Sequence, residues 1–386
     1  MLSRRSRFVA TLAVAVLSLT AGCSFGPPGP DQAGSPPNLP RPSAAPTAGG
    51  DDGQREVAIT VLAKNLEIPW GIAFLPDGGA VVTERDTARI LKVGPESTAS
   101  GLKVAELRRL SEVRATGDGG LLGIAVSPNY KTDQTLYVYY STDRDNRIGK
   151  LAGDGALQPI LTGIPRSTEF NGGALAFGPD GLLYAGTGDS TPAGAQAVGA
   201  KSLAGKILRI TTAGKPAPGN PVKSSPVWSS GHRNVQGITW DQSKRMYATD
   251  RGQPRTSELN VIQKGKNYGW PKADGESTDP KLTNPILQWP SDTSSCAGVG
   301  VLETTVATAC VLGEKLQIVT VTTGGTILGS PQELLPGEFG RLRALATAPD
   351  GSFWVSTSNQ EDAGDPGPED DRVIRLVFSD GGAGRS

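Results

Sequence analysis

Arginine, asparagine and glutamine side chains gather in one short segment, Ser230–Gly237, which reads SGHRNVQG. Arg233 offers a planar fork of N–H donors that suits carboxylates, while Asn234 and Gln236 both donate and accept hydrogen bonds. This combination favours a planar polyacid or a sugar as ligand. The alternative is a network that only satisfies the backbone of a buried loop.

Two further arginines, Arg341 and Arg343, are separated by one residue. Because successive side chains of a strand point to opposite faces, both are expected on one face of a strand. They are either part of a site or ordinary charges on a solvated strand, and the sequence leaves both interpretations open.

The segment Thr249–Asn260 combines glycine and proline with carboxylates, and Asn267–Pro271 follows it. Backbone carbonyls of such a loop, together with nearby carboxylates, are the hard oxygen ligands that calcium prefers. A glycine cluster, Gly117–Gly123, contains Asp118 and precedes a strand pattern. It would let the backbone approach a ligand or simply form a tight turn, and no lysine follows to make it a phosphate loop.

The composition excludes several classes of function. The 386 residues carry no formal net charge, so there is no basic field to hold nucleic acid. One histidine and three cysteines exclude a multi-histidine zinc site and a zinc finger. General-base chemistry is thereby restricted to His232, a carboxylate or a lysine.

The chain repeats a pattern of strand, Pro-Asp/Asn-Gly turn and strand. Copies are centred on Asp77, Asn129, Asp180 and Asp350, with a degenerate one at Asp241 and a hidden one expected near residues 295–325. Six units of about 55 residues predict an all-β fold, a six-bladed β-propeller. Val57–Ala63 is expected to supply the missing outer strand and close the ring. A tandem of β-sandwiches is the alternative.

The amino-terminal region reads as an export signal. Basic residues and an apolar stretch too short to span a bilayer lead to Cys23 in a lipobox-like sequence. We expect a lipoprotein signal peptide over residues 1–22 and a flexible Pro/Gly-rich tether over 23–54. The propeller would occupy residues 55–379 and a tail 380–386, with the protein lipid-anchored through Cys23 to the outer face of the cell membrane.

Export also bears on the other two cysteines. Cys296 and Cys310 are expected to form a disulfide, because exported proteins meet an oxidising environment.

The acidic loop Glu361–Asp371 is interpreted as a solvated turn without a role.

Taken together, these segments resemble the glucose/sorbosone dehydrogenase family, the soluble quinoprotein sugar dehydrogenases. The resemblance covers most of residues 60–378 and rests on five motifs in order: Pro69–Gly78, Gly119–Ala125, Asn171–Gly181, Gly231–Asn234 and Asn267–Pro271. It implies a propeller that binds pyrroloquinoline quinone (PQQ) and calcium over its central channel. In such enzymes a histidine takes the proton of the sugar hydroxyl while hydride moves to the quinone.

Carried over by motif, the resemblance implies that Arg233, Asn234 and Gln236 contact the cofactor. It also implies that Arg341 and Arg343 hold the quinone carboxylates, which agrees with the bidentate geometry of arginine.

For calcium, the resemblance implies that Gly252 and Gln253 supply two backbone carbonyl ligands. Glu258 and Tyr268 remain in the same region, whereas Ser257 stands where the family usually has Asp.

The main departure from the family pattern is Phe170, which occupies the position of the catalytic histidine. The chain's one histidine, His232, lies in the binding motif instead. Glu169 is a candidate substitute base because it is adjacent. Asp118 is a further candidate cofactor residue, but it stands where a longer Glu or Gln is usual, so a contact to quinone or sugar is expected to be lost.

Three functions follow as hypotheses. The first is oxidation of a sugar or other alcohol with PQQ and calcium. The second is a degenerate propeller that binds a glycan, cofactor or protein without turnover, as Phe170 suggests. The third, a calcium-dependent lactonase-like hydrolase, has weaker motif support.

Overall fold

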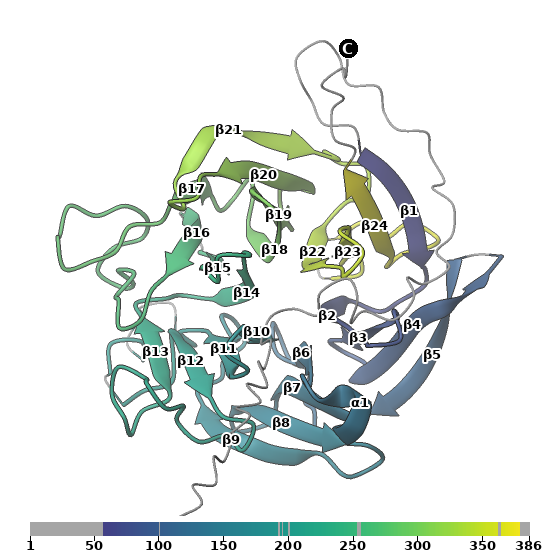
Figure 1. Ribbon diagram of the computed structural model, residues 1–386, viewed down its shortest axis with the longest axis horizontal. Helices are drawn as coiled ribbons and strands as arrows, with labels where there is room; N and C mark the ends of the chain where they lie inside the picture. Colours follow the sequence, from purple (N-terminus) through teal and green to yellow (C-terminus); the bar gives the residue numbers. More distant parts are fainter. Residues whose placement is uncertain are drawn as a thin grey trace, which may run out of the picture.

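The computed structural model describes residues 57–99, 101–191, 194, 196–199, 201–252, 256–361 and 364–378. In these ranges the strands form six four-stranded antiparallel sheets arranged as blades around a centre (Figure 1). The predicted six-bladed propeller is confirmed. The signal segment, Cys23, the tether and Gln253 lie outside the described residues.

Each of the first five blades uses four consecutive strands. Blade one contains β2 (Pro69–Phe74), β3 (Ala80–Glu84), β4 (Arg89–Thr98) and β5 (Gly101–Arg109). Blade two contains β6 (Leu121–Val126), β7 (Thr135–Ser141), β8 (Asn146–Ala152) and β9 (Gln158–Ile164), with the short helix α1 (Tyr130–Asp133) between its first two strands. Blade three contains β10 (Gly172–Phe177), β11 (Leu183–Thr187), β12 (Lys206–Ile210) and β13 (Val227–Ser230).

The later blades follow the same order. Blade four contains β14 (Val235–Trp240), β15 (Met246–Asp250), β16 (Thr256–Ile262) and β17 (Leu287–Pro290). Blade five contains β18 (Cys296–Leu302), β19 (Thr305–Cys310), β20 (Lys315–Val321) and β21 (Ile327–Leu334). Blade six contains β22 (Leu342–Thr347), β23 (Phe353–Thr357) and β24 (Val373–Phe378), and β1 (Val57–Ala63) is its outer strand.

The ring is closed by β1, which pairs antiparallel with β24 from Val57 opposite Phe378 to Ala63 opposite Val373. The predicted closing strand is therefore confirmed. Beyond β1, the backbones of Leu66 and Asp371 exchange two hydrogen bonds of 2.9 Å, which extends the contact between the two ends of the ring.

The repeated Pro-Asp-Gly turns join the first and second strands of their blades. Gly78, Gly181 and Gly351 in these turns have φ between 74° and 86°, a conformation that glycine adopts at little cost. The expected hidden copy is blade five. Its β18–β19 turn runs through Glu303, at φ 51°, in place of Pro-Asp-Gly, which explains why the pattern is hard to see there.

The loops at the opposite end of the strands carry most of the residues singled out above. Because strands alternate in direction, a loop that precedes a first strand lies at the same end as a loop that follows a second strand. Loops before first strands carry Asp118, Phe170, Arg233 and Arg341, and loops after second strands carry Arg85, Asp189, Arg251 and Glu361. This end of the ring is therefore where a site is expected.

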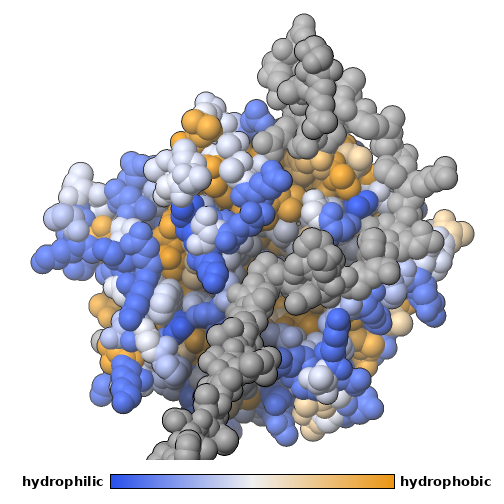
Figure 2. All heavy atoms as spheres, in the orientation of Figure 1, coloured by the Kyte–Doolittle hydropathy of each residue, from blue (hydrophilic) through white to orange (hydrophobic). Residues whose placement is uncertain are grey.

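The core lies between neighbouring blades. In one cluster Trp70 of blade one, Leu122 of blade two and Leu175 of blade three are buried together. Figure 2 shows hydrophilic side chains over much of the described surface in that view, with apolar residues in separate groups. In the part of the chain that the structure describes, no helix is long and apolar enough to cross a membrane.

Cys296 and Cys310 form the expected disulfide and lie opposite each other on β18 and β19. Both are buried in the core that blade four and blade five share. The bond therefore links two neighbouring strands that already pair through their backbones.

We predict that Cys296→Ala/Cys310→Ala lowers the free energy of unfolding by about 3 kcal/mol, because the unfolded chain regains the freedom of a short loop. Urea denaturation checks this value. In reductant, the stability of the wild type should approach that of the variant. Equal stability of the variant and of the wild type without reductant would show that the bond has no stabilising role.

Candidate functional site

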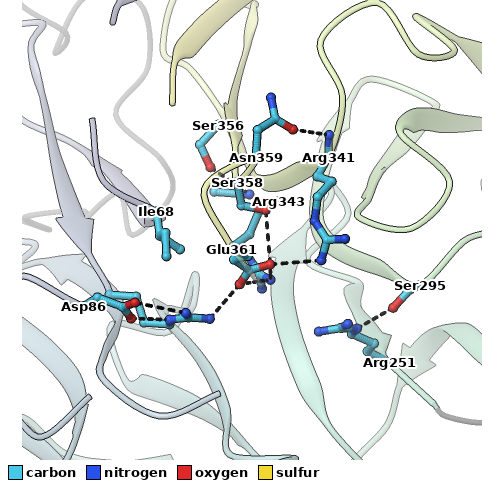
Figure 3. Close-up of polar contacts among 12 residues, drawn as sticks. Ile68, Asp86, Arg251, Ser295, Arg341, Arg343, Ser356, Ser358, Asn359 and Glu361 are labelled. Atoms are coloured by element: carbon cyan, nitrogen blue, oxygen red, sulfur yellow. Dashed lines mark hydrogen bonds and ion pairs between the residues drawn. The ribbon is translucent and has the colours of Figure 1, made fainter. Parts of the chain in front are cut away.

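Glu361 is the centre of an ion-pair cluster that joins the last blade to the first (Figure 3). Its side chain is 7% exposed, and it accepts hydrogen bonds from Arg85 Nη1 at 2.7 Å and Arg341 Nη2 at 3.3 Å. Arg343 Nη2 donates to both carboxylate oxygens, at 2.5 Å to Oε2. Three guanidinium groups thus share one buried carboxylate.

This environment sets the charge of Glu361. Burial alone would raise the pKa of its carboxyl, but the charges of Arg343 and Arg85 outweigh burial and lower that pKa to about 2. Glu361 is therefore ionised at neutral pH.

The interpretation of Glu361–Asp371 as a solvated turn is wrong at both ends. Asp371 is fully buried and accepts hydrogen bonds from the N–H groups of Ile68, at 3.1 Å, and Asn359, at 2.5 Å. Thr357 Oγ1 donates to it as well, at 3.0 Å. An acidic run usually marks a solvated face, but here its end residues meet donors of blade six itself and, through ring closure, Arg85 and the N–H of Ile68.

Arg251 extends the cluster and was not singled out from the sequence. Its side chain is buried and Nε donates to Ser295 Oγ. Burial and the nearby charge of Arg343 lower the pKa of Arg251, while Asp118 and Glu361 oppose that shift. Asp118 is partly buried and also acts on Arg85, so it lies within electrostatic reach of two arginines.

The charges of this arginine cluster do not balance. Four arginines (Arg85, Arg251, Arg341 and Arg343) face Glu361, Asp118 and Asp86, the last paired with Arg85 at 2.6 Å. A surplus of positive charge in a largely desolvated place favours an anionic ligand.

In blade four, Asp250 shapes the loop that carries Arg233 and Asn234. Its carboxylate accepts the N–H of Arg233 at 2.9 Å and the N–H of Asn234 at 2.6 Å, and lies 3.3 Å from His232 Nδ1. Asn234 Oδ1 accepts the N–H of Gly172 at 2.8 Å. The side-chain oxygen of Asn234 therefore joins blade four to blade three.

The guanidinium of Arg233 lies 4.6 Å from the ring of Phe170 and 4.1 Å from the ring of Trp270. These distances are those of cation–π contacts. Trp270 Nε1 is held in turn by Asp189 Oδ2 at 2.8 Å. Phe170 thus packs against a predicted cofactor residue.

Several buried polar atoms in this region have no hydrogen-bond partner among the described residues. They include Nε of Arg233, Arg341 and Arg343, and Oε1 of Gln236. Buried polar groups are nearly always paired, so orphaned ones indicate a missing ligand or water. The guanidinium donors fit a polycarboxylate such as PQQ, whereas the Gln236 oxygen is an acceptor and would pair with a donor of the ligand or with water.

Three of the four predicted calcium residues lie around a cavity of about 10 Å³, room for one water-sized particle; the fourth, Gln253, is outside the described residues. Gly252, Glu258 and Tyr268 line it, together with Asp250 and Asp274. Burial, followed by the charge of Asp250, raises the pKa of Glu258 to about 8.

The side chains around this cavity are largely engaged by the protein. Glu258 accepts from the N–H of Gly275 and from Asn260 Nδ2, both at 2.9 Å, and the Tyr268 hydroxyl donates to Val261 O at 2.6 Å. Ser257 Oγ lies 3.0 Å from Ser291 Oγ. Among the described residues no group of three or more His, Cys, Asp or Glu is arranged to hold a metal. A calcium site here would depend on backbone carbonyls.

His232 is not placed to act as a general base on a ligand. It is fully buried, its Nε2 lies 2.8 Å from Ser229 Oγ, and its ring stacks on Tyr268. Glu169, next to Phe170, is exposed. The histidine therefore supports the loop structure rather than facing solvent.

Residues 66–364 match the family model described as Glucose / Sorbosone dehydrogenase, and the chain belongs to that family. Sequence relatives include aldose sugar dehydrogenase YliI of Escherichia coli, 27% identical with 78% of this chain and 90% of that protein covered. Quinoprotein glucose dehydrogenase B of Acinetobacter calcoaceticus is 29% identical, but the match spans only 57% of this chain and 53% of that protein.

Among solved structures, the PQQ-bound form of aldose sugar dehydrogenase from Streptomyces coelicolor is 40% identical to this chain. The superposition covers 87% of this chain and all of that one, with a TM-score of 0.78.

We predict that Glu361→Gln lowers the free energy of unfolding at pH 7 by about 3–5 kcal/mol, because it leaves the arginines short of a buried partner. The folded-state pKa lies below the ordinary value of 4.5, so this contribution is present above about pH 4.5 and is lost as the pH falls toward 2. Urea denaturation at pH 7 and pH 3 should therefore show a smaller difference between variant and wild type at the lower pH.

The matched control is Glu369→Gln. Glu369 lies in the same loop, but its ion pair with Lys64 is solvent-exposed, so little change is expected. If Glu361→Gln leaves the free energy of unfolding unchanged, or lowers it equally at both pH values, the assignment of Glu361 as a buried, ionised partner of the arginines is contradicted.

Proposed function

We propose that this chain binds PQQ at the end of the propeller that carries the arginine cluster. The observation that carries the proposal is the surplus of arginines together with the unpartnered Nε atoms of Arg341 and Arg343. A planar polycarboxylate supplies both the missing acceptors and the missing negative charge. The 40% identity to a PQQ-bound aldose sugar dehydrogenase supports the choice of ligand.

In this proposal Arg341 and Arg343 hold carboxylates of the cofactor, and Arg233 and Gln236 contribute further donors and acceptors. Asn234 acts mainly by keeping the Arg233 loop in place, since its oxygen is engaged by Gly172. Calcium would be held by backbone carbonyls at Gly252 and Gln253.

The proposed reaction is oxidation of a sugar or another alcohol. PQQ, when bound, supplies the acceptor for the hydride equivalent. The proton of the hydroxyl requires a base, and Phe170 cannot provide one. The absence of a positioned base typically costs about 10²–10⁴ in rate. This observation favours a second candidate function, a propeller that binds its ligand with little or no turnover.

We predict that the purified propeller binds PQQ in the presence of calcium, measured by titration calorimetry. Arg341→Gln/Arg343→Gln should weaken binding by at least about a hundredfold, because two charge-assisted contacts are lost. Lys315→Gln, which removes an ion pair with Glu333 between β20 and β21, is the control and should bind like the wild type. Absence of binding by the wild type would overturn the proposed function.

Reduction of a dye by loaded protein, across a panel of aldoses, separates the two candidates. Low activity that rises about 10²-fold or more in Phe170→His identifies an enzyme lacking its base. Binding without dye reduction in either protein identifies a non-catalytic binder. Loss of the wild-type activity in Glu169→Gln would assign the residual base to Glu169.

We further propose that the protein is exported and lipid-anchored through Cys23. The support is the basic, apolar and small-residue order of residues 4–23 and the disulfide between Cys296 and Cys310.

We predict that wild-type protein expressed in a bacterial host fractionates with membranes and incorporates labelled palmitate, whereas Cys23→Ala does neither. Cys296→Ala/Cys310→Ala is the control and should still be labelled, since it lacks only the disulfide. Equal labelling of Cys23→Ala and wild type would contradict the anchor.

A further inference from the structure

Glu361 occupies the same edge of the arginine pair that a carboxylate ligand would use. Nη2 of Arg341 and Nη2 of Arg343 both donate to Glu361. The neighbouring Nε atoms of both arginines are buried without an acceptor. Each arginine thus uses one of the two N–H groups on this edge, Nη2, for Glu361, and Figure 3 shows this contact for Arg341.

A carboxylate that binds arginine side-on takes one hydrogen bond from Nε and one from Nη2. On Arg341 and Arg343 the Nη2 partner is already Glu361. An incoming carboxylate therefore reaches its full pair of hydrogen bonds only after Glu361 has moved away.

The backbone of Arg341 does not depend on Glu361. Its N–H donates to Asn359 Oδ1 at 2.8 Å, and Asn359 Nδ2 donates to the carbonyl of Phe339 at 2.9 Å. Asn359 is held in turn by Asp371, whose carboxylate accepts the N–H of Asn359. The arginine loop can thus keep its place while the side chain of Glu361 is exchanged.

The charges favour exchange over simple loss of Glu361. If Glu361 left alone, four arginines would face only Asp118 and Asp86. A ligand carboxylate that arrives as Glu361 leaves replaces the negative charge that is lost, so the two carboxylates compete for one position. Arg85 keeps Asp86 as a partner at 2.6 Å throughout.

We propose that Glu361 is a resident carboxylate that holds Arg341 and Arg343 in the ligand-free protein and is displaced by a carboxylate of the cofactor. The ligand class is a planar aromatic polycarboxylate, and its identity as PQQ rests on the proposed function. Glu361 thereby sets the affinity of the site, and every ligand that binds must outcompete it.

The test is titration calorimetry of PQQ with calcium into wild type, Glu361→Gln and the control Glu369→Gln. Removing the competing charge should tighten binding by roughly 10- to 100-fold, the equivalent of one charge-assisted hydrogen bond. Glu369→Gln, whose ion pair with Lys64 is exposed, should bind like the wild type. Equal or weaker binding by folded Glu361→Gln would overturn the inference.

The outcomes separate this inference from the proposed function. Binding by Glu361→Gln but not by the wild type supports the resident carboxylate and overturns PQQ binding by the native chain. Binding by both with equal affinity supports the proposed function and overturns the inference. Failure of both to bind overturns both.

A second measurement uses the wild type and does not depend on the folding of the variant. Hydrogen exchange with mass spectrometry follows the peptide that contains Ser358–Glu361 before and after addition of PQQ. Displacement of Glu361 predicts faster exchange of this peptide on binding, against slower exchange of the peptide that contains Arg341. Slower exchange of both peptides would show that Glu361 stays in place.

Discussion

Antiparallel pairing of β1 with β24 places the two ends of the described chain in one sheet, and the rest of the molecule depends on it. An open array of six blades would leave the outer edge of β24 unpaired and blade one packed on one side only, against blade two. Closure brings Arg85 of blade one against Glu361 of blade six, although the two residues are 276 positions apart. The loops of all six blades then meet around one axis, where a ligand can touch several of them.

The same closure creates the electrostatic character of the site. Glu361 is buried because ring closure covers it, and it is ionised because Arg343 and Arg85 outweigh the cost of burial. Arg251 adds a charge that no described carboxylate contacts directly. A cluster of this kind is stable only with anions nearby, so the property that holds the blades together also makes the site receptive to carboxylates. Next to this cluster, the ring of Phe170 lies 4.6 Å from the guanidinium of Arg233 and packs against it.

Much of the fold could be predicted from the sequence because each blade carries a local signal. The Pro-Asp-Gly turns mark the first hairpin in blades one, three and six, where glycine is needed at positive φ. Blade five lacks the turn and could only be inferred from the spacing. Arg341, Arg343 and Arg233 could be found because they stand in motifs.

Glu361, Arg85 and Arg251 could not be found in this way. Glu361 lies in an acidic run that resembles a solvated turn, and nothing local indicates that Arg85 will face it. Arg251 is a single arginine in a Gly/Pro loop, and the acceptor of its Nε, Ser295, belongs to the next blade. Interactions between residues far apart in the chain become visible only when the ring is built.

The central claim is that Arg341 and Arg343 exchange Glu361 for a carboxylate of the cofactor. A crystal structure of the protein grown with PQQ and calcium tests it most directly. We predict that a cofactor carboxylate accepts hydrogen bonds from the Nε and Nη2 atoms of both arginines, with Glu361 turned away from them. Cofactor bound elsewhere, or bound while Glu361 keeps its contacts to both arginines, would contradict it.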